Sequence, residues 1–104
     1  MEVIYYQNDN IVRLNSLYDN LAAAYVNDAT VKLLRIVDSD GNTVDGGGCP
    51  VTMAYIAGSD GNYAGAVDDG LEVTPKKKYK AVIDVTAGTT KAKFEPTLLC
   101  KRRR

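Results

Sequence analysis

The run CPVTMAYIAGSDGNYAGAV, residues 49–67, constrains the fold of this chain more than any other segment. Two stretches suited to β-strands, 51–56 and 63–67, flank the sequence GSDGN at 58–62. The glycines and Asx residues of GSDGN accept the positive φ angles that a tight reversal requires. The run therefore predicts a β-hairpin in which alternate residues of each strand share a face.

Short apolar or alternating stretches recur along the rest of the chain, separated by turns rich in Gly and Asx. The apolar stretch ending at Val37 suggests a central strand buried on both faces, or a bulge. Pro75 stops one strand, and Pro96 breaks or bulges another. Further strands are predicted at residues 31–37, 71–73, 79–85, 92–94 and 98–100, and the stretches 1–6 and 11–14 predict an edge strand or a hairpin at the sheet margin. About seven short strands predict an all-β protein, an immunoglobulin-like antiparallel β-sandwich, with an open barrel as the alternative.

Residues 14–25 allow two interpretations. The local spacing of the apolar residues is helical, and Asn15 or Ser16 is a suitable N-cap. A helix here is only about three turns long, and short helices depend on tertiary packing. The second interpretation, an extended segment ending in a turn, is only what the family resemblance given below implies. The residues with helical spacing are Leu14, Leu17, Tyr18, Leu21 and Tyr25.

The length and composition are those of one globular domain. A β-sandwich of about a hundred residues uses nearly the whole of this 104-residue chain. Hydrophobic residues at 45% and charged residues at 25% predict a real core. No apolar run approaches the roughly 20 residues of a membrane span. We expect a single domain over residues 1–104 with no membrane segment.

Residues for catalysis or metal binding are scarce. The chain has no histidine, which removes the commonest general base and a common zinc ligand. The sequence DSDGN at 38–42 fails as an EF-hand loop, because Gly41 is fourth and Cys49 twelfth, where glycine is needed sixth and glutamate twelfth. Cys49 and Cys100 predict two partly buried thiols, and a disulfide between them stays open. We expect no enzyme activity, no cofactor and no metal site.

Charge is distributed unevenly although the net charge is zero. Residues 1–35 carry three basic and four acidic side chains, a sum of minus one. Residues 36–75 carry seven acidic and no basic side chains, whereas residues 76–104 carry ten basic against two acidic side chains, a sum of plus eight. Such a distribution suits contacts with partners or copies of complementary charge, or simply solvated turns.

The candidate interaction residues follow from these charged segments. The basic ones also suggest a nucleic-acid contact, protection of a strand edge, or docking to an acidic protein surface that includes another copy of the chain. The candidates are Asp60, Asn62, Asp68, Asp69, Lys76, Lys77, Lys78, Lys80, Arg102, Arg103 and Arg104. Of the seven tyrosines, Tyr55, Tyr63 and Tyr79 are expected in the core with bonded hydroxyls, and the other four are better interface candidates.

Four blocks occur in a fixed order: NDATV at 27–31, DSDG at 38–41, PVTMAY at 50–55 and GSDGNYAG at 58–65. Together they resemble a family of small tailed-bacteriophage and prophage structural proteins, over roughly residues 10–100. The block GSDGNYAG is the most specific element. Cys49 departs from the pattern, because the family has tryptophan at this point.

The resemblance implies a virion structural protein, assembled in the bacterial host cytoplasm and encoded among head and tail morphogenesis genes. It implies binding to capsid or head–tail connector subunits as a decoration, cement or joining component, and it brings no catalytic residues. Two alternatives stay open from the residues alone. They are an immunoglobulin-like adhesion or carbohydrate-binding module, and a nucleic-acid-associated protein that uses the basic carboxy-terminal third.

Overall fold

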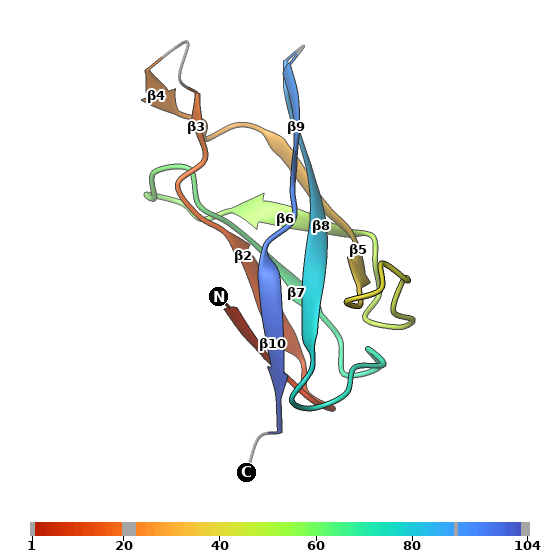
Figure 1. Cartoon of the computed structure of the whole chain (residues 1–104). Helices are drawn as coiled ribbons and strands as arrows, with labels where there is room; N and C mark the ends of the chain where they lie inside the picture. The colour runs from red at the N-terminus through yellow and green to blue at the C-terminus, as the bar shows by residue number, and fades with distance from the viewer. Residues whose placement is uncertain (1, 20–22, 89, 103–104) are drawn as a thin grey trace.

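The structure of the chain is a computed structural model that describes residues 2–19, 23–88 and 90–102. This part of the chain contains ten strands and no helix, so the predicted all-β class is confirmed (Figure 1). The strands are β1 (Glu2–Tyr5), β2 (Asn10–Leu14), β3 (Tyr18–Asp19), β4 (Ala24–Tyr25), β5 (Thr30–Val37), β6 (Val51–Tyr55), β7 (Tyr63–Val67), β8 (Lys78–Ala87), β9 (Thr90–Phe94) and β10 (Thr97–Lys101).

Eight of these strands form one sheet, and β3 and β4 form a small separate hairpin. The order across the sheet is β1-β10-β8-β5-β6-β7-β2, and β9 also pairs with β8. The pairing is antiparallel except between β1 and β10, which run parallel. The expectation of purely antiparallel strands is therefore wrong at this one edge. The immunoglobulin-like arrangement stays a prediction.

The two end strands of the sheet, β1 and β2, follow each other in the sequence, so the sheet is nearly closed. The polar turn at residues 6–9 joins them, as its composition predicts. Asn10 fixes this corner from a buried position: its Oδ1 accepts a bond from Tyr5 N at 2.8 Å, and its Nδ2 donates to Tyr5 O at 3.0 Å and to Asn8 O at 3.0 Å. A buried amide requires such partners.

The long strands β5 and β8 form the centre of the sheet (Figure 1). Their register shifts between Leu33 and Arg35, which is the bulge expected in this apolar stretch. Above the bend at Pro96, β9 pairs with one half of β8, and below it β10 pairs with the other half. The predicted break at Pro96 is therefore confirmed.

The hairpin predicted at residues 49–67 is present as β6 and β7. Its loop carries Gly58 at φ +79° and Gly61 at φ +71°. Gly61 is required, because a Cβ at this position would lie 2.5 Å from Leu17 O. The loop at 58–62 therefore reverses the chain between β6 and β7 and also contacts the segment that follows β2.

The helical interpretation of residues 14–25 is wrong for the described part of this segment. Leu14 ends β2, and β3 pairs with β4. Hydrogen bonds to the 58–62 loop explain the outcome: Ser16 N donates to Asn62 Oδ1 at 2.8 Å, and Leu17 N donates to Gly61 O at 2.9 Å. Leu21 lies outside the described residues.

The strand predicted at residues 71–73 is also absent, although Leu71 and Val73 are buried. Glu72 N donates to Asp45 O at 2.9 Å, so the backbone here bonds to the loop at residues 45–48 and does not pair as a strand. The alternating apolar residues at this point are buried beneath a loop and are not part of a strand. The turns at 38–42 and 68–70 occur as predicted, each with an aspartate side chain bonded to backbone N–H groups.

The tyrosines expected in the core have bonded hydroxyls. Tyr79 Oη accepts a bond from Thr74 N at 2.8 Å, and Tyr55 Oη donates to Ser59 O. Tyr63, 1% exposed, donates to Val26 O at 2.7 Å and accepts from Ala29 N at 3.1 Å. The last of these connects β7 to the segment before β5.

Replacing Tyr63 with phenylalanine is expected to lower the free energy of unfolding by about 2 kcal/mol, because two backbone groups lose their partner. Urea unfolding followed by circular dichroism measures the loss. Tyr25→Phe is the matched control, since this ring is 45% exposed, and its effect should stay within about 0.5 kcal/mol. Equal effects of the two substitutions would refute a structural role of the Tyr63 hydroxyl.

Candidate interaction surface

Basic side chains gather on the outer face of the sheet, over β5, β8, β9 and β10. Alternate residues of a strand point to opposite faces, and Lys80 is exposed between the buried Tyr79 and Ala81. Lys32 lies opposite Asp84 in the β5–β8 pair, and Lys93 lies opposite Asp84 in the β8–β9 pair. Asp84 is thus placed between two lysines of neighbouring strands.

We call this surface the basic sheet face. Seven exposed basic side chains point outward from the four strands, against one acidic side chain at Asp84, a sum of plus six. The basic side chains are Lys32, Arg35, Lys78, Lys80, Lys91, Lys93 and Lys101. Val82 on the same face is only 3% exposed and lies opposite Arg35, which fits long side chains lying over the sheet.

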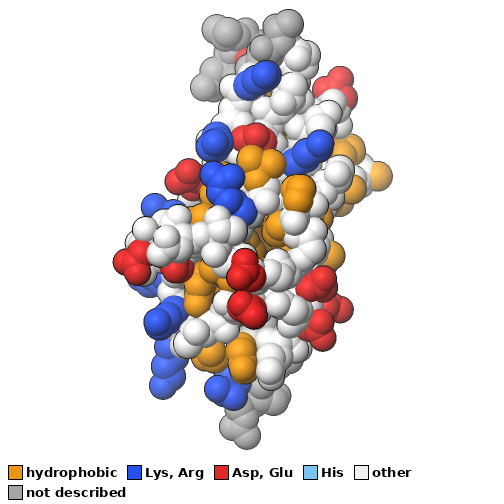
Figure 2. Space-filling view, turned by 90° about the vertical axis from the view of Figure 1, so that its right-hand side faces the viewer, with side chains coloured by type: hydrophobic (Ala, Val, Ile, Leu, Met, Phe, Trp, Pro, Cys, Tyr) orange, Lys and Arg blue, Asp and Glu red, His pale blue; other side chains and the backbone are white. Residues whose placement is uncertain are grey.

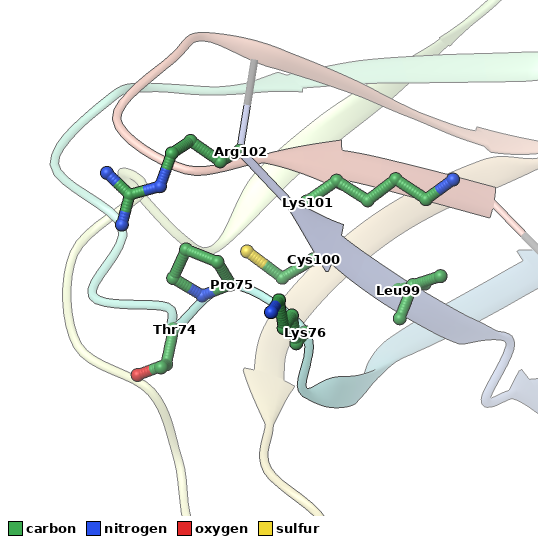
Figure 3. A pocket seen from close by; sticks show the side chains of 7 residues that line it. All are labelled: Thr74, Pro75, Lys76, Leu99, Cys100, Lys101 and Arg102. Carbon is green, nitrogen blue, oxygen red and sulfur yellow. The ribbon is translucent and has the colours of Figure 1, made fainter. Parts of the chain in front are cut away.

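A cleft of about 750 Å³ lies beside this face, between residues 74–76 and the end of β10 (Figure 3). Pro75 and Cys100 lie at the centre of the view in Figure 3, while Arg102 and Lys101 extend to opposite sides. Its lining residues are Thr74, Pro75, Lys76, Leu99, Cys100, Lys101 and Arg102. The lining contains three basic side chains and no acidic one.

Hydrogen bonds fix the backbone on both sides of the cleft. Lys76 N donates to Cys100 O at 2.8 Å, and Cys100 N donates to Lys77 O at 3.0 Å. The Arg102 guanidinium lies over the Tyr6 ring, 5.3 Å from its centroid, and Tyr6 N donates to Lys101 O at 2.8 Å. A cation held over an aromatic face in this way keeps its charge while losing conformational freedom.

Four acidic residues, Asp45, Asp68, Asp69 and Glu72, lie on two loops that pack together. Asp68 N donates to Gly47 O at 3.1 Å, and Glu72 N donates to Asp45 O at 2.9 Å. These bonds bring the loop around Asp45 against the loop at 68–72. In the lower half of Figure 2, the charged side chains right of centre are acidic, while the left margin carries most of the basic ones. The molecule therefore presents surfaces of different charge.

The structure brings some of the predicted interaction residues together and separates others. Lys76 and Arg102 line the same cleft, and Lys78 and Lys80 lie on the basic sheet face. Lys77 is exposed in the turn before β8. Asp68 and Asp69 are exposed on the loop after β7, whereas Asp60 lies on the β6–β7 loop. Arg103 and Arg104 lie outside the described residues.

Asn62 has an internal role. Its Oδ1 accepts a bond from Ser16 N, and its backbone N donates to Ser59 Oγ at 3.3 Å. The first bond holds the chain after β2 against the β6–β7 loop and the second lies within that loop, so Asn62 contributes to the fold.

The sequence-based choice missed Lys32, Arg35, Lys91, Lys93 and Lys101. These residues are scattered over three strands, and only the strand register places them beside the lysines of β8. The available indication was their alternation with apolar residues within each strand, which predicts one solvent-facing side.

Four tyrosines were proposed for an interface, and two of them are prominently exposed. Tyr18 and Tyr25 are 46% and 45% exposed, and their rings meet edge to face with centroids 5.3 Å apart. They lie on the β3–β4 hairpin at the top of Figure 1. Tyr5 and Tyr6 are half-buried beside the carboxy-terminal strand.

Both cysteines are unpaired thiols, with Cys49 half-buried and Cys100 buried. Burial raises the pKa of the Cys49 thiol, and the negative charge of Asp68 raises this pKa further. Burial also raises the pKa of Cys100. Both groups are therefore neutral thiols at physiological pH, and neither has the lowered pKa of a reactive cysteine.

Within the described residues, no group of three or more His, Cys, Asp or Glu side chains is placed to hold a metal ion. The same part of the chain contains no helix with the length and hydropathy needed to cross a membrane.

Comparison of the chain with protein-family models, with curated proteins and with solved structures gave no match in any of the three cases.

Proposed function

We propose that the protein is a structural component of a tailed-bacteriophage or prophage particle and binds capsid or head–tail connector subunits as a decoration or joining component. The observation that carries the proposal is the basic sheet face, where seven exposed cations lie over paired β-strands. A rigid surface of one charge suits docking to an acidic partner, because the side chains need little reorganisation of the backbone.

The ordered sequence blocks add support to the proposal. The GSDGN loop and the preceding β6 strand form one hairpin, and Asn27 Oδ1 of the NDATV block accepts a bond from Gly61 N at 2.8 Å. Three of the four blocks, NDATV, PVTMAY and GSDGNYAG, therefore contact one another in the scaffold that presents the basic sheet face.

Mass spectrometry of purified particles tests the proposal. We expect peptides of this chain in particles and in head or tail assembly intermediates, at a constant copy number relative to the capsid subunit. Absence of the chain from particles and from every intermediate would contradict the proposed function.

Nucleic-acid binding is the second candidate, and the same seven cations favour it. Two features favour a protein partner: Asp84 lies within the face, and β5, β8, β9 and β10 place no described aromatic side chain on its outer side for base stacking. Titration with single- and double-stranded DNA at low salt tests this candidate. Binding that falls steeply with added salt and exceeds the affinity for particle subunits would favour it.

A further inference from the structure

We propose that the cleft beside the basic sheet face receives an acidic segment of the partner subunit, with one apolar side chain of that segment on the cleft floor. The inference rests on the proposed function, because the partner subunit provides the segment. It adds the chemistry of the recognised segment and the residues that recognise it.

The floor of the cleft is apolar and its rim is cationic. Pro75 and Leu99 are half-buried, and Cys100 is buried; in Figure 3, Pro75 and Cys100 lie at the centre of the view and Leu99 lies to the right. These three apolar residues form the floor of the cleft. Lys76, Lys101 and Arg102 surround this centre and are all exposed. A free phosphate requires the cations alone, whereas an apolar floor favours a ligand that also carries an apolar side chain.

The rim is prepared for carboxylates before a ligand arrives. The Tyr6 ring supports the Arg102 guanidinium, and a guanidinium binds a carboxylate through two parallel hydrogen bonds. Lys76 has φ +73°, in the left-handed region that residues with side chains rarely adopt, and its N–H bond to Cys100 O holds it there. Strained residues of this kind cluster at binding sites.

The acidic loop at residues 68–72 of a second copy does not fit the cleft. The segment 68–72 has three acidic side chains, but its apolar residue Leu71 is only 5% exposed in its own fold. It therefore has no apolar side chain to place on the floor. A different chain, with an apolar residue between exposed carboxylates, matches both the rim and the floor.

Two blocked pentapeptides, one of leucine between pairs of aspartates and one of serine between the same pairs, test the inference by NMR titration of the ¹⁵N-labelled full chain. We expect the leucine peptide to shift the amide signals of Thr74, Lys76 and residues 99–102 saturably. The serine peptide should bind about tenfold more weakly, because it buries no side chain of leucine size. A pentathymidylate of similar charge should bind more weakly than the leucine peptide.

Substitutions in the cleft separate the rim from the floor. Arg102→Glu should abolish saturable binding of both peptides, and Leu99→Ser should weaken the leucine peptide while leaving the serine peptide unchanged. Arg13→Glu is the matched control, since it makes the same charge change on β2, outside both the cleft and the basic sheet face. The spectra themselves show whether each variant is folded.

Four results would each overturn the inference: no saturable binding, equal binding of the two peptides, signal changes centred outside the cleft, or tighter binding of the pentathymidylate. Mass spectrometry of purified particles distinguishes failure of the cleft inference from failure of the proposed function. Chains present in particles without peptide binding refute the cleft inference alone. Peptide binding by a chain that is absent from particles refutes the proposed function.

Discussion

Replacing Lys78, Lys80 and Lys91 together with glutamate is expected to lower the affinity for the partner subunit by about 100-fold. Each substitution removes an exposed charge pair and adds repulsion, so the three together cost about 3 kcal/mol, which corresponds to this factor. None of the three lies opposite an acidic residue in its strand pair. The sheet itself should therefore tolerate the changes. Quantitative mass spectrometry of particles assembled with the variant measures its copy number.

The single substitution Lys80→Glu can be compared with a matched control, Arg13→Glu. Arg13 is exposed on β2, which lies at an end of the sheet and contributes nothing to the basic sheet face. Both substitutions change the charge by minus two, so a general effect of net charge would affect them equally. A normal copy number for the triple variant, with unchanged thermal unfolding, would contradict docking through this face.

Replacing Gly46 with alanine is expected to lower the free energy of unfolding by about 3 kcal/mol or more. The φ angle of Gly46 is +85°, and a Cβ would lie 2.0 Å from Gly70 O. The left-handed conformation alone costs a residue with a side chain about 1–2 kcal/mol, and the clash with backbone forces the two loops apart. Urea denaturation at constant temperature measures the change.

Gly41→Ala separates the two causes. Gly41 has the same φ of +85°, but a Cβ there meets no atom within 4 Å. Its substitution should cost about 1 kcal/mol, the conformational part alone. Equal destabilisation by the two alanines would mean that contact between the 45–48 and 68–72 loops contributes nothing to stability.

Local patterns predicted those strands whose partners lie on a pleated, half-buried sheet. The β6–β7 hairpin and the alternation of β8 follow from residue type and spacing, and both are confirmed. At residues 14–25 and 71–73 the prediction failed, because hydrogen bonds to distant loops decide the backbone there. Neither the Gly61–Leu17 bond nor the Glu72–Asp45 bond can be recognised from the sequence around these residues.

For the candidate surface as well, one part could be predicted from the sequence and another part depends on the fold. The basic run at residues 76–80 and Arg102 were visible as charge in the sequence, but the cleft that joins them depends on β10 returning beside residues 74–77. Lys32 and Lys93 become neighbours of Asp84 only through the register of three strands. The charged residues can be counted in the sequence, whereas their arrangement on one face depends on how the strands pair.

Lysine acetylation of the protein alone and in assembled particles, read by mass spectrometry, tests docking through the basic sheet face most directly. We expect assembly to protect the six lysines of the face, while Lys77, in the turn outside the face, stays reactive. Equal labelling of these six lysines in the free and assembled protein would contradict it. The protected lysines are expected to be Lys32, Lys78, Lys80, Lys91, Lys93 and Lys101.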